Sequence, residues 1–211
     1  MKTGAVLTAD IVNSSLLSPK DLDSLKADIE QEFVFSQPAV QFYRGDSFNV
    51  LVSTEKAMFE VAKLRAFARL KQPHKTKENV DIRIAIGIGQ IDEPVLTMAN
   101  GQGEAFTLSG RELDILSKSN KRLIIRCYDQ KAESGLKAIA IYADYILSRL
   151  SVQQAQVFLE MLQGVSEKEA AWSLKKSQPT IHKLKKAALW DDFEQILNLY
   201  KDIVNDLKPV D

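Results

Sequence analysis

Patterns typical of β-strands stop near residue 131 of this 211-residue chain, whereas patterns typical of helices continue to its end. Before that point, short runs of branched residues alternate with amphipathic stretches, as in a mixed sheet-and-helix domain. After it, every segment has the spacing of apolar residues that one face of a helix requires. Such a change marks a boundary between folding units. We therefore predict an α+β domain over residues 1–128, a connecting helix over 129–150 and an all-α domain over 151–211.

Residues that typically begin or interrupt helices and strands help to locate the elements of the predicted α+β domain. Ser18 and Pro19 have the positions of a cap and a first helical residue. Gly87 and Gly89 lie inside a run of β-branched residues and indicate close approach of another backbone. We expect strands at residues 4–9, in a hairpin over 39–53, at 79–91 and at 121–128, and helices at 18–33, 54–70 and 100–119.

Composition limits the class of protein. Lys+Arg and Asp+Glu are 28 each, so the whole-chain charge indicates no polyanionic partner. The one cysteine, Cys127, excludes a disulfide framework and favours a reducing compartment. We find no signal peptide and no apolar run long enough to span a bilayer, so we expect a cytoplasmic protein without a membrane partner. A P-loop is excluded because the chain has no GxxxxGK[ST] motif.

Two aspartates follow predicted strands. In residues 41–52, QFYRGDSFNVLV, Gly45 tolerates positive φ and Asp46 can hydrogen-bond its own backbone, so the pair closes a hairpin. Asp10 ends the first strand. If that strand lies beside the hairpin, a divalent cation such as Mg²⁺ or Mn²⁺ would relieve the repulsion between the carboxylates and leave positions for phosphates. On spacing alone, a cap at Asp10 and a turn at Asp46 are the alternative.

Four segments within residues 4–126 resemble, in order, the catalytic domain of class III nucleotidyl cyclases. They are LTADIVNSS, FYRGDSFNVLV, DIRIAIGIGQI and GQGEAFTLSGREL. The resemblance implies a ferredoxin-like, nucleotidyl-cyclase-like α/β sandwich. It also implies metal ligands at Asp10, at the backbone carbonyl of Ile11 and at Asp46.

The same resemblance implies contacts with a purine nucleotide. The family motif Gly-x-x-Val-Asn-x-x-x-Arg falls on Gly103, Phe106, Thr107 and Arg111, and Arg44 completes the candidate nucleotide-binding set. Thr107 stands where the family has an asparagine that steadies the ribose, and Arg111 matches the arginine that stabilises the transition-state phosphate. The family's purine-reading lysine and aspartate are not found. If the chain is a cyclase, Thr107 and Arg111 are its catalytic candidates; we expect nucleotide or metal binding with little turnover.

Residues 150–190 predict three short helices joined by short turns, which is typical of a helix-turn-helix. The pattern resembles the DNA-binding region of sigma-type and LuxR-type regulators, where Ser-Gln opens the recognition helix. Its turn holds Lys175 and Lys176, where a glycine and an apolar residue are usual. The predicted capping residues are, in order, Ser151 with Gln154, Gly164, Ser166 with Glu169, and Ser177.

We predict that the third of these helices contacts DNA through one face. Ile181 and Leu184 point inward, and residues 175–186 hold five lysines and no acid, which is the electrostatic footprint of a phosphate-binding element. Gln178 has the chemistry to pair with adenine and Lys183 with guanine. A solvated lysine face without a partner is the alternative. The predicted DNA-binding residues are Gln178, Thr180, His182, Lys183, Lys185 and Lys186.

Residues 191–207 carry an apolar stripe that packs on its own domain or pairs with a second copy. Because two-fold DNA readers need two subunits, we predict a homodimer.

A cyclase-like sheet domain followed by a helix-turn-helix resembles the SatD family of bacterial proteins over nearly the whole chain. Our leading hypothesis is a DNA-binding transcriptional regulator whose first domain senses a nucleotide with Mg²⁺. A second is an active nucleotidyl cyclase whose C-terminal helices serve dimerisation or docking, and a third is an interaction protein in which neither site works. Thr107 and the missing purine-reading residues favour the regulator over the active cyclase. The lysine face of the third helix favours the regulator over the interaction protein.

Overall fold

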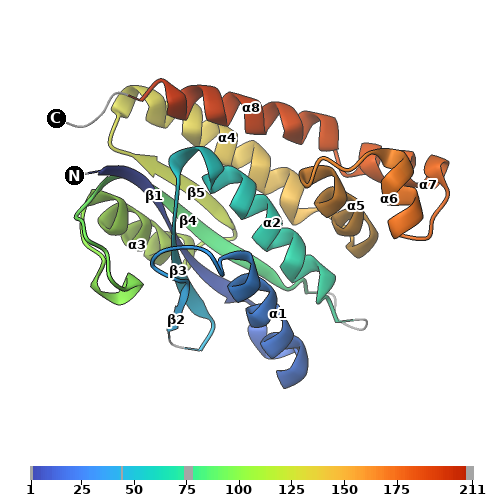
Figure 1. The fold of residues 1–211 in the computed structure, drawn as a ribbon, viewed down its shortest axis with the longest axis horizontal. Helices are drawn as coiled ribbons and strands as arrows, with labels where there is room; N and C mark the ends of the chain where they lie inside the picture. Colours follow the sequence, from blue (N-terminus) through green and yellow to red (C-terminus); the bar gives the residue numbers. More distant parts are fainter. Residues whose placement is uncertain (1, 44, 74–77, 208–211) are drawn as a thin grey trace.

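The computed structural model describes residues 2–43, 45–73 and 78–207. The strands are β1 (Lys2–Val12), β2 (Gln41–Tyr43), β3 (Ser47–Val52), β4 (Asp81–Ile91) and β5 (Leu123–Cys127). The helices are α1 (Pro19–Glu32), α2 (Ala57–Leu70), α3 (Glu104–Leu116), α4 (Gln130–Ser148), α5 (Val152–Leu162), α6 (Glu167–Ser173), α7 (Gln178–Ala187) and α8 (Trp190–Asn205). The mixed α+β class and the succession of helices after β5 are confirmed (Figure 1). In the described part of the chain, no helix combines the length and apolarity needed to cross a membrane.

The described strands form one five-stranded sheet in the order β2-β3-β1-β4-β5. β1 is antiparallel to both β3 and β4, and β4 is parallel to β5. In this register Asp10 of β1 pairs with Ser47 of β3 on one side and with Arg83 of β4 on the other. The end of β1 therefore lies between the hairpin and β4.

Helix α3 packs directly on β4 because two glycines leave room for it. A Cβ atom on Gly87 would lie 2.2 Å from the carbonyl oxygen of Ala105, and one on Gly89 would lie 2.9 Å from Glu104 Oε2. The close backbone approach predicted for these glycines is confirmed. The hydroxyl of Thr8 on β1 donates to Ser109 Oγ at 2.8 Å, which fixes α3 over this face of the sheet.

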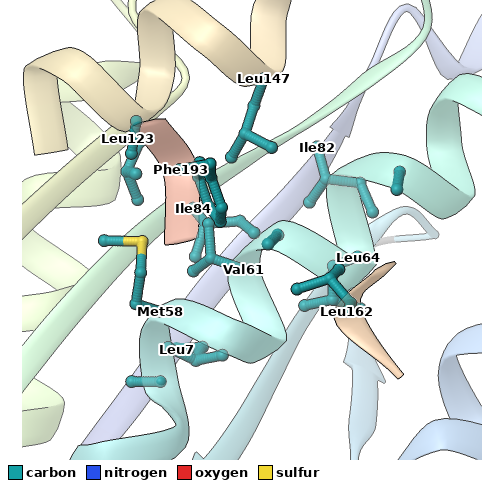
Figure 2. Close-up of a cluster of buried hydrophobic side chains, with 14 of the residues drawn as sticks. Leu7, Met58, Val61, Leu64, Ile82, Ile84, Leu123, Leu147, Leu162 and Phe193 are labelled. Carbon is teal, nitrogen blue, oxygen red and sulfur yellow. The ribbon is translucent and has the colours of Figure 1, made fainter. Parts of the chain in front are cut away.

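The other face of the sheet carries the main core, which unites both ends of the chain. Figure 2 shows Leu7 and Ile84 of the sheet together with Leu162 of α5 and Phe193 of α8. The apolar stripe of α8 is thus buried in its own chain, and the Tyr200 hydroxyl donates to the carbonyl oxygen of Thr54 at 2.8 Å. The division at residues 128 and 150 stays a prediction, and the intact chain is the unit for experiments.

A buried ion-pair network ties α2 to β4 and α4. Arg65 Nε lies 2.9 Å from Asp81 Oδ1 and its Nη2 lies 2.8 Å from Asp81 Oδ2. The third guanidinium nitrogen, Nη1, lies 2.7 Å from Asp144 Oδ1. Because all three nitrogens bind carboxylates, the charges of both acids are compensated inside the fold.

Candidate functional site

The sheet register brings the two predicted carboxylates to the same end of β1. The backbone N–H of Ile11 donates to the carbonyl oxygen of Asp46 at 3.1 Å, so the hairpin tip is fastened to the residue after Asp10. Ser14, at the start of the turn that follows β1, donates its hydroxyl to Asp46 Oδ2 at 2.8 Å. We call Asp10, Ile11 and Asp46 the carboxylate corner.

The charge of Asp10 is only partly compensated. Its side chain is 24% exposed, and Arg83 Nη1 lies 3.2 Å from Oδ2. The other oxygen, Oδ1, is buried and has no hydrogen-bond partner. Burial raises the pKa of Asp10 above its ordinary value, and the charge of Asp46 raises it further, while Arg83 and Arg122 lower it. The charge of Asp46 therefore acts on the carboxyl group of Asp10.

These residues fit a hard divalent cation held by few protein ligands. Mg²⁺ commonly binds through one or two carboxylates and takes its other ligands from water and phosphates. Asp10 offers an oxygen without a partner, and Asp46 is hydrogen-bonded through only one of its oxygens in the contacts above. Among the described residues, no group of three or more Asp, Glu, His or Cys side chains is arranged to hold a metal. A closed all-protein metal cage is therefore not the type of site that this corner supports.

A cavity of about 400 Å³ opens beside Asp10, between the sheet and α3. Thr8, Tyr43 and Ser47 line it from the strands, and Asp114 lines it from α3. Polar side chains therefore surround the corner on two sides. Asp114 was not among the residues predicted from the sequence, because the face that α3 turns toward Asp10 depends on packing.

The predicted nucleotide-binding residues of α3 lie elsewhere. Gly103 caps the helix at a φ of 116°, where a Cβ atom would lie 2.5 Å from the Gln90 carbonyl oxygen. Thr107 is exposed and donates its hydroxyl to the Gly103 carbonyl oxygen at 3.2 Å. Arg111 is also exposed, and neither side chain lines the cavity beside Asp10. Arg44 lies outside the described residues.

Arg83 is the side chain at the corner that sequence reasoning missed. The alternation in DIRIAIGIGQI places it on the opposite face from Ile82 and Ile84, which indicated a polar position. Its pairing with Asp10 depends on the β1–β4 register, and periodicity alone does not fix a register.

The second candidate site is formed by α5, α6 and α7. Each helix begins at its predicted cap. In the two capping boxes, Ser151 exchanges hydrogen bonds with Gln154, and Ser166 with Glu169. Ser177 Oγ accepts from the Thr180 N–H at 3.3 Å and opens α7.

The turn between α6 and α7 closes without glycine. Lys175 adopts a φ of 52°, in the left-handed region that glycine enters at no cost. The following N–H, of Lys176, donates to the Ala171 carbonyl oxygen at 2.9 Å, which is the hydrogen bond of a Schellman motif. This position is where the sequence departs from the usual helix-turn-helix, and the turn nevertheless has a standard geometry.

Most of the predicted DNA-binding residues are exposed on α7: Gln178, Thr180, His182, Lys183 and Lys186. Lys185 differs, because its Nζ lies 2.9 Å from Asp191 Oδ1 and it is half-buried. His182 Nδ1 lies 3.3 Å from Glu167 Oε1. Trp172, near the end of α6, is 86% exposed and was not predicted as a site residue.

Comparison with known proteins assigns no family and no function to the chain. No protein-family model matches the chain, and no curated protein matches it. A solved structure of the active GGEEF domain of a diguanylate cyclase from Vibrio cholerae is similar, with a TM-score of 0.42 and 14% sequence identity. The similarity covers 61% of this chain and 85% of that one. No site residue or activity follows from a similarity at this level, and the resemblance to the SatD family stays a prediction.

Proposed function

We propose that this protein is a DNA-binding regulator of the SatD type that places α7 in the major groove. One observation carries the proposal. α7 buries Ile181 and leaves Gln178, Lys183 and Lys186 exposed, directly after a tight turn from α6. In helix-turn-helix proteins the start of the second helix reaches base edges, and lysines further along contact phosphates.

Two features support DNA over a solvated lysine face without a partner. The α6–α7 turn places Lys175 in a left-handed conformation, which costs about 1–2 kcal/mol for a residue other than glycine. The exposed indole of Trp172 lies on α6, beside the same turn, where it can contact a bound duplex.

The test measures binding of the intact chain to a random-sequence duplex. Fluorescence anisotropy of the labelled duplex gives the association constant at each concentration of a salt series. The logarithm of the association constant should fall linearly with the logarithm of salt concentration, by about 0.9 per phosphate contact. Lys183→Ala should reduce that slope, whereas Lys201→Ala, an exposed lysine on α8, should leave it unchanged. Wild-type protein that shows no salt-dependent binding, or an equal effect of both substitutions, would contradict the proposal.

A base-reading role for Gln178 has a different readout. Once a preferred duplex has been selected from a random pool, Gln178→Ala should lose about 1–3 kcal/mol of discrimination at one base position. The salt slope should stay the same, since an amide neutralises no phosphate. Uniform weakening across all duplexes would assign Gln178 a structural role.

We further propose that the carboxylate corner binds the phosphates of a purine nucleotide through Mg²⁺ or Mn²⁺. Asp10 and Asp46 would hold the ion, with the Ile11 carbonyl as an additional ligand, and the Asp10 Oδ1 atom without a partner supports this. A bound ion would neutralise phosphate charge and orient the phosphates. Arg83 would then contact a phosphate oxygen in place of the Asp10 oxygen that it now pairs with.

The second candidate function, a nucleotidyl cyclase, is less well supported. It needs Thr107 and Arg111 at the nucleotide, and both are exposed outside the cavity that Asp10 lines. ATP or GTP with Mn²⁺ should therefore give little or no cyclic nucleotide. Robust product from the wild type that is abolished in Asp10→Ala would favour the cyclase instead.

A dimer on a two-fold DNA site would need a surface other than the α8 stripe. Phe193, Ile196 and Tyr200 of that stripe are buried in their own chain. Light scattering of the protein with and without duplex would give the number of chains per site.

A further inference from the structure

A second polar cavity, of about 440 Å³, lies at the end of the sheet where β1 stops and β4 and β5 begin. It is separate from the cavity beside Asp10, since the two share no lining residue. The lining residues whose side chains carry N–H donors are Asn13, Arg69, Asn79, Asn120 and Arg122. Ser148 also lines it, but its hydroxyl donates to Asp144 Oδ1. We call this cavity the arginine pocket.

The two arginines carry charge that the fold compensates incompletely. Arg69 has a side chain only 4% exposed, and its Nε is buried without a hydrogen-bond partner. Its Nη2 donates to the Ser148 carbonyl oxygen at 3.3 Å and lies 3.6 Å from Asp81 Oδ2, which is beyond hydrogen-bonding distance. Burial lowers the pKa of Arg69, because a charged group in this position lacks solvation.

The acids near the pocket do not supply the missing partner. Both oxygens of Asp81 already accept hydrogen bonds from Arg65. Asp144 accepts from Arg65 through Oδ1 and from the backbone N–H of Arg122 through Oδ2. Asp81 and Glu78 both line the pocket, and Arg69 Nε has no hydrogen bond to either acid.

Arg122, which also lines the pocket, makes one weak internal contact through its guanidinium group. Its Nη1 donates to the neighbouring Lys121 carbonyl oxygen at 3.3 Å. Asn13, another lining residue, adopts a φ of 58° and donates Nδ2 to the Asn79 carbonyl oxygen at 2.9 Å. This bond ties the end of β1 to the segment before β4 and fixes part of the pocket lining.

We propose that the arginine pocket binds the phosphate group of a small molecule. A tetrahedral oxyanion offers several acceptor oxygens, which match the forked donors of two guanidinium groups. Asparagine side chains add neutral donors around it. The pocket is large enough for inorganic phosphate or for the phosphate of a nucleoside monophosphate, so the shared chemistry is the phosphate group.

The direct readout is the ¹⁵N–¹H spectrum of arginine Nε groups in the intact protein. Inorganic phosphate, titrated at constant ionic strength with a chelator present, should shift two of these resonances saturably, with a Kd of about 1 mM or tighter. The chelator removes divalent cations, so the result is independent of the carboxylate corner. A parallel titration with adenosine monophosphate distinguishes the sources. Equal affinity identifies free phosphate, and higher affinity for the nucleotide identifies an esterified phosphate.

Variants decide whether the pocket is the site. Arg122→Gln should weaken phosphate binding by about tenfold or more, since it removes a charge-assisted partner but keeps the backbone contact to Asp144. Asn120→Asp, at the exposed rim, should weaken it as well without touching the core. Arg149→Gln, which removes an exposed arginine that does not line the pocket, is the matched control and should have no effect. The proposal fails if phosphate does not saturate the resonances, or if Arg122→Gln binds as the wild type does. Equal weakening by Arg149→Gln would also overturn it, because general surface charge would then explain the binding.

Discussion

Lys185 Nζ lies 2.9 Å from Asp191 Oδ1 and 3.7 Å from Glu167 Oε1, so one lysine of the proposed DNA-binding face is paired within its own chain. The hydrogen bond to Asp191 raises the pKa of Lys185 above its ordinary value. Lys185 is thus charged at neutral pH, but two acids offset its field. Lys186, by contrast, is exposed, and none of the ion pairs in the described residues involves it.

The two lysines should therefore differ in their effect on DNA binding. Lys186→Ala should reduce the salt slope by about 0.9, the value for one phosphate contact. Lys185→Ala should reduce it by less, and Asp191→Asn should strengthen binding because it frees Lys185. Anisotropy titrations of the three variants measure these slopes. If Lys185→Ala reduces the salt slope as much as Lys186→Ala does, and Asp191→Asn leaves binding unchanged, the ion pair does not limit the contribution of Lys185 to DNA binding.

Replacement of Asp46 tests the carboxylate corner. Asp46→Asn should weaken Mn²⁺ binding by about tenfold or more, because it removes one of two charged ligands while an amide can still accept from Ser14. Paramagnetic broadening of resonances near β1 measures the affinity. Binding should also weaken as the pH falls, since protons compete for Asp10 at a pKa above its ordinary 3.8. Asp202→Asn, on the exposed face of α8, is the control, and an equal loss in that variant would point to non-specific ion binding.

The features predicted correctly from the sequence are local ones. The capping boxes at Ser151 and Ser166 use residues three positions apart, so the pattern and the hydrogen bonds coincide. Gly87 and Gly89 interrupt a run of branched residues, and only close packing of another element explains glycine there.

The features that were missed depend on residues far apart in the chain. Asp10 and Arg83 are 73 positions apart, and only the strand register brings them together. The periodicity of α8 predicted an apolar stripe around Phe193, but a stripe does not name the surface that buries it. Lys185 and Asp191 lie on two helices joined through Leu189, which has a φ of 54°, and the sequence gives no sign of that left-handed residue.

Glu60 should make the stability of the protein depend on pH. Burial raises the pKa of this α2 side chain from 4.5 to about 7, the charge of Glu32 adds to the effect, and its Oε2 has no hydrogen-bond partner. Because the folded pKa is the higher one, the stabilising contribution is fully present below pH 4.5 and is lost as the pH rises to about 7. The loss is about 3.5 kcal/mol at most, at roughly 1.4 kcal/mol per pKa unit.

Urea unfolding of the wild type and of Glu60→Gln, measured between pH 5 and pH 8, checks this expectation. The variant should lose less stability over this range, since its amide does not titrate. Glu55→Gln, whose side chain is exposed at the turn before α2, is the control and should keep the wild-type dependence. Parallel curves for the wild type and Glu60→Gln would show that Glu60 ionises in the folded protein without penalty.

Asp81→Asn tests whether the buried ion pairs hold the two ends of the chain in one cooperative unit. The side chains of Arg65 and Asp81 are 1% and 7% exposed, so removal of one charge leaves the guanidinium of Arg65 poorly compensated inside the fold. Breaking such a pair costs about 3–5 kcal/mol. The matched control is Asp28→Asn, which breaks the more exposed pair with Lys71 and should cost about 1 kcal/mol or less.

Denaturant unfolding, followed by both tryptophan fluorescence and circular dichroism, measures the loss. Trp172 and Trp190 both lie in the C-terminal helices, whereas circular dichroism reports the whole chain. Because Leu162 and Phe193 share a core with Leu7 and the network joins α2, β4 and α4, the two probes should give one coincident transition. That transition should move to lower denaturant concentration in Asp81→Asn, since the substitution weakens a contact on which both ends depend. Two separate transitions in the wild type would instead show that the helices fold independently of the sheet.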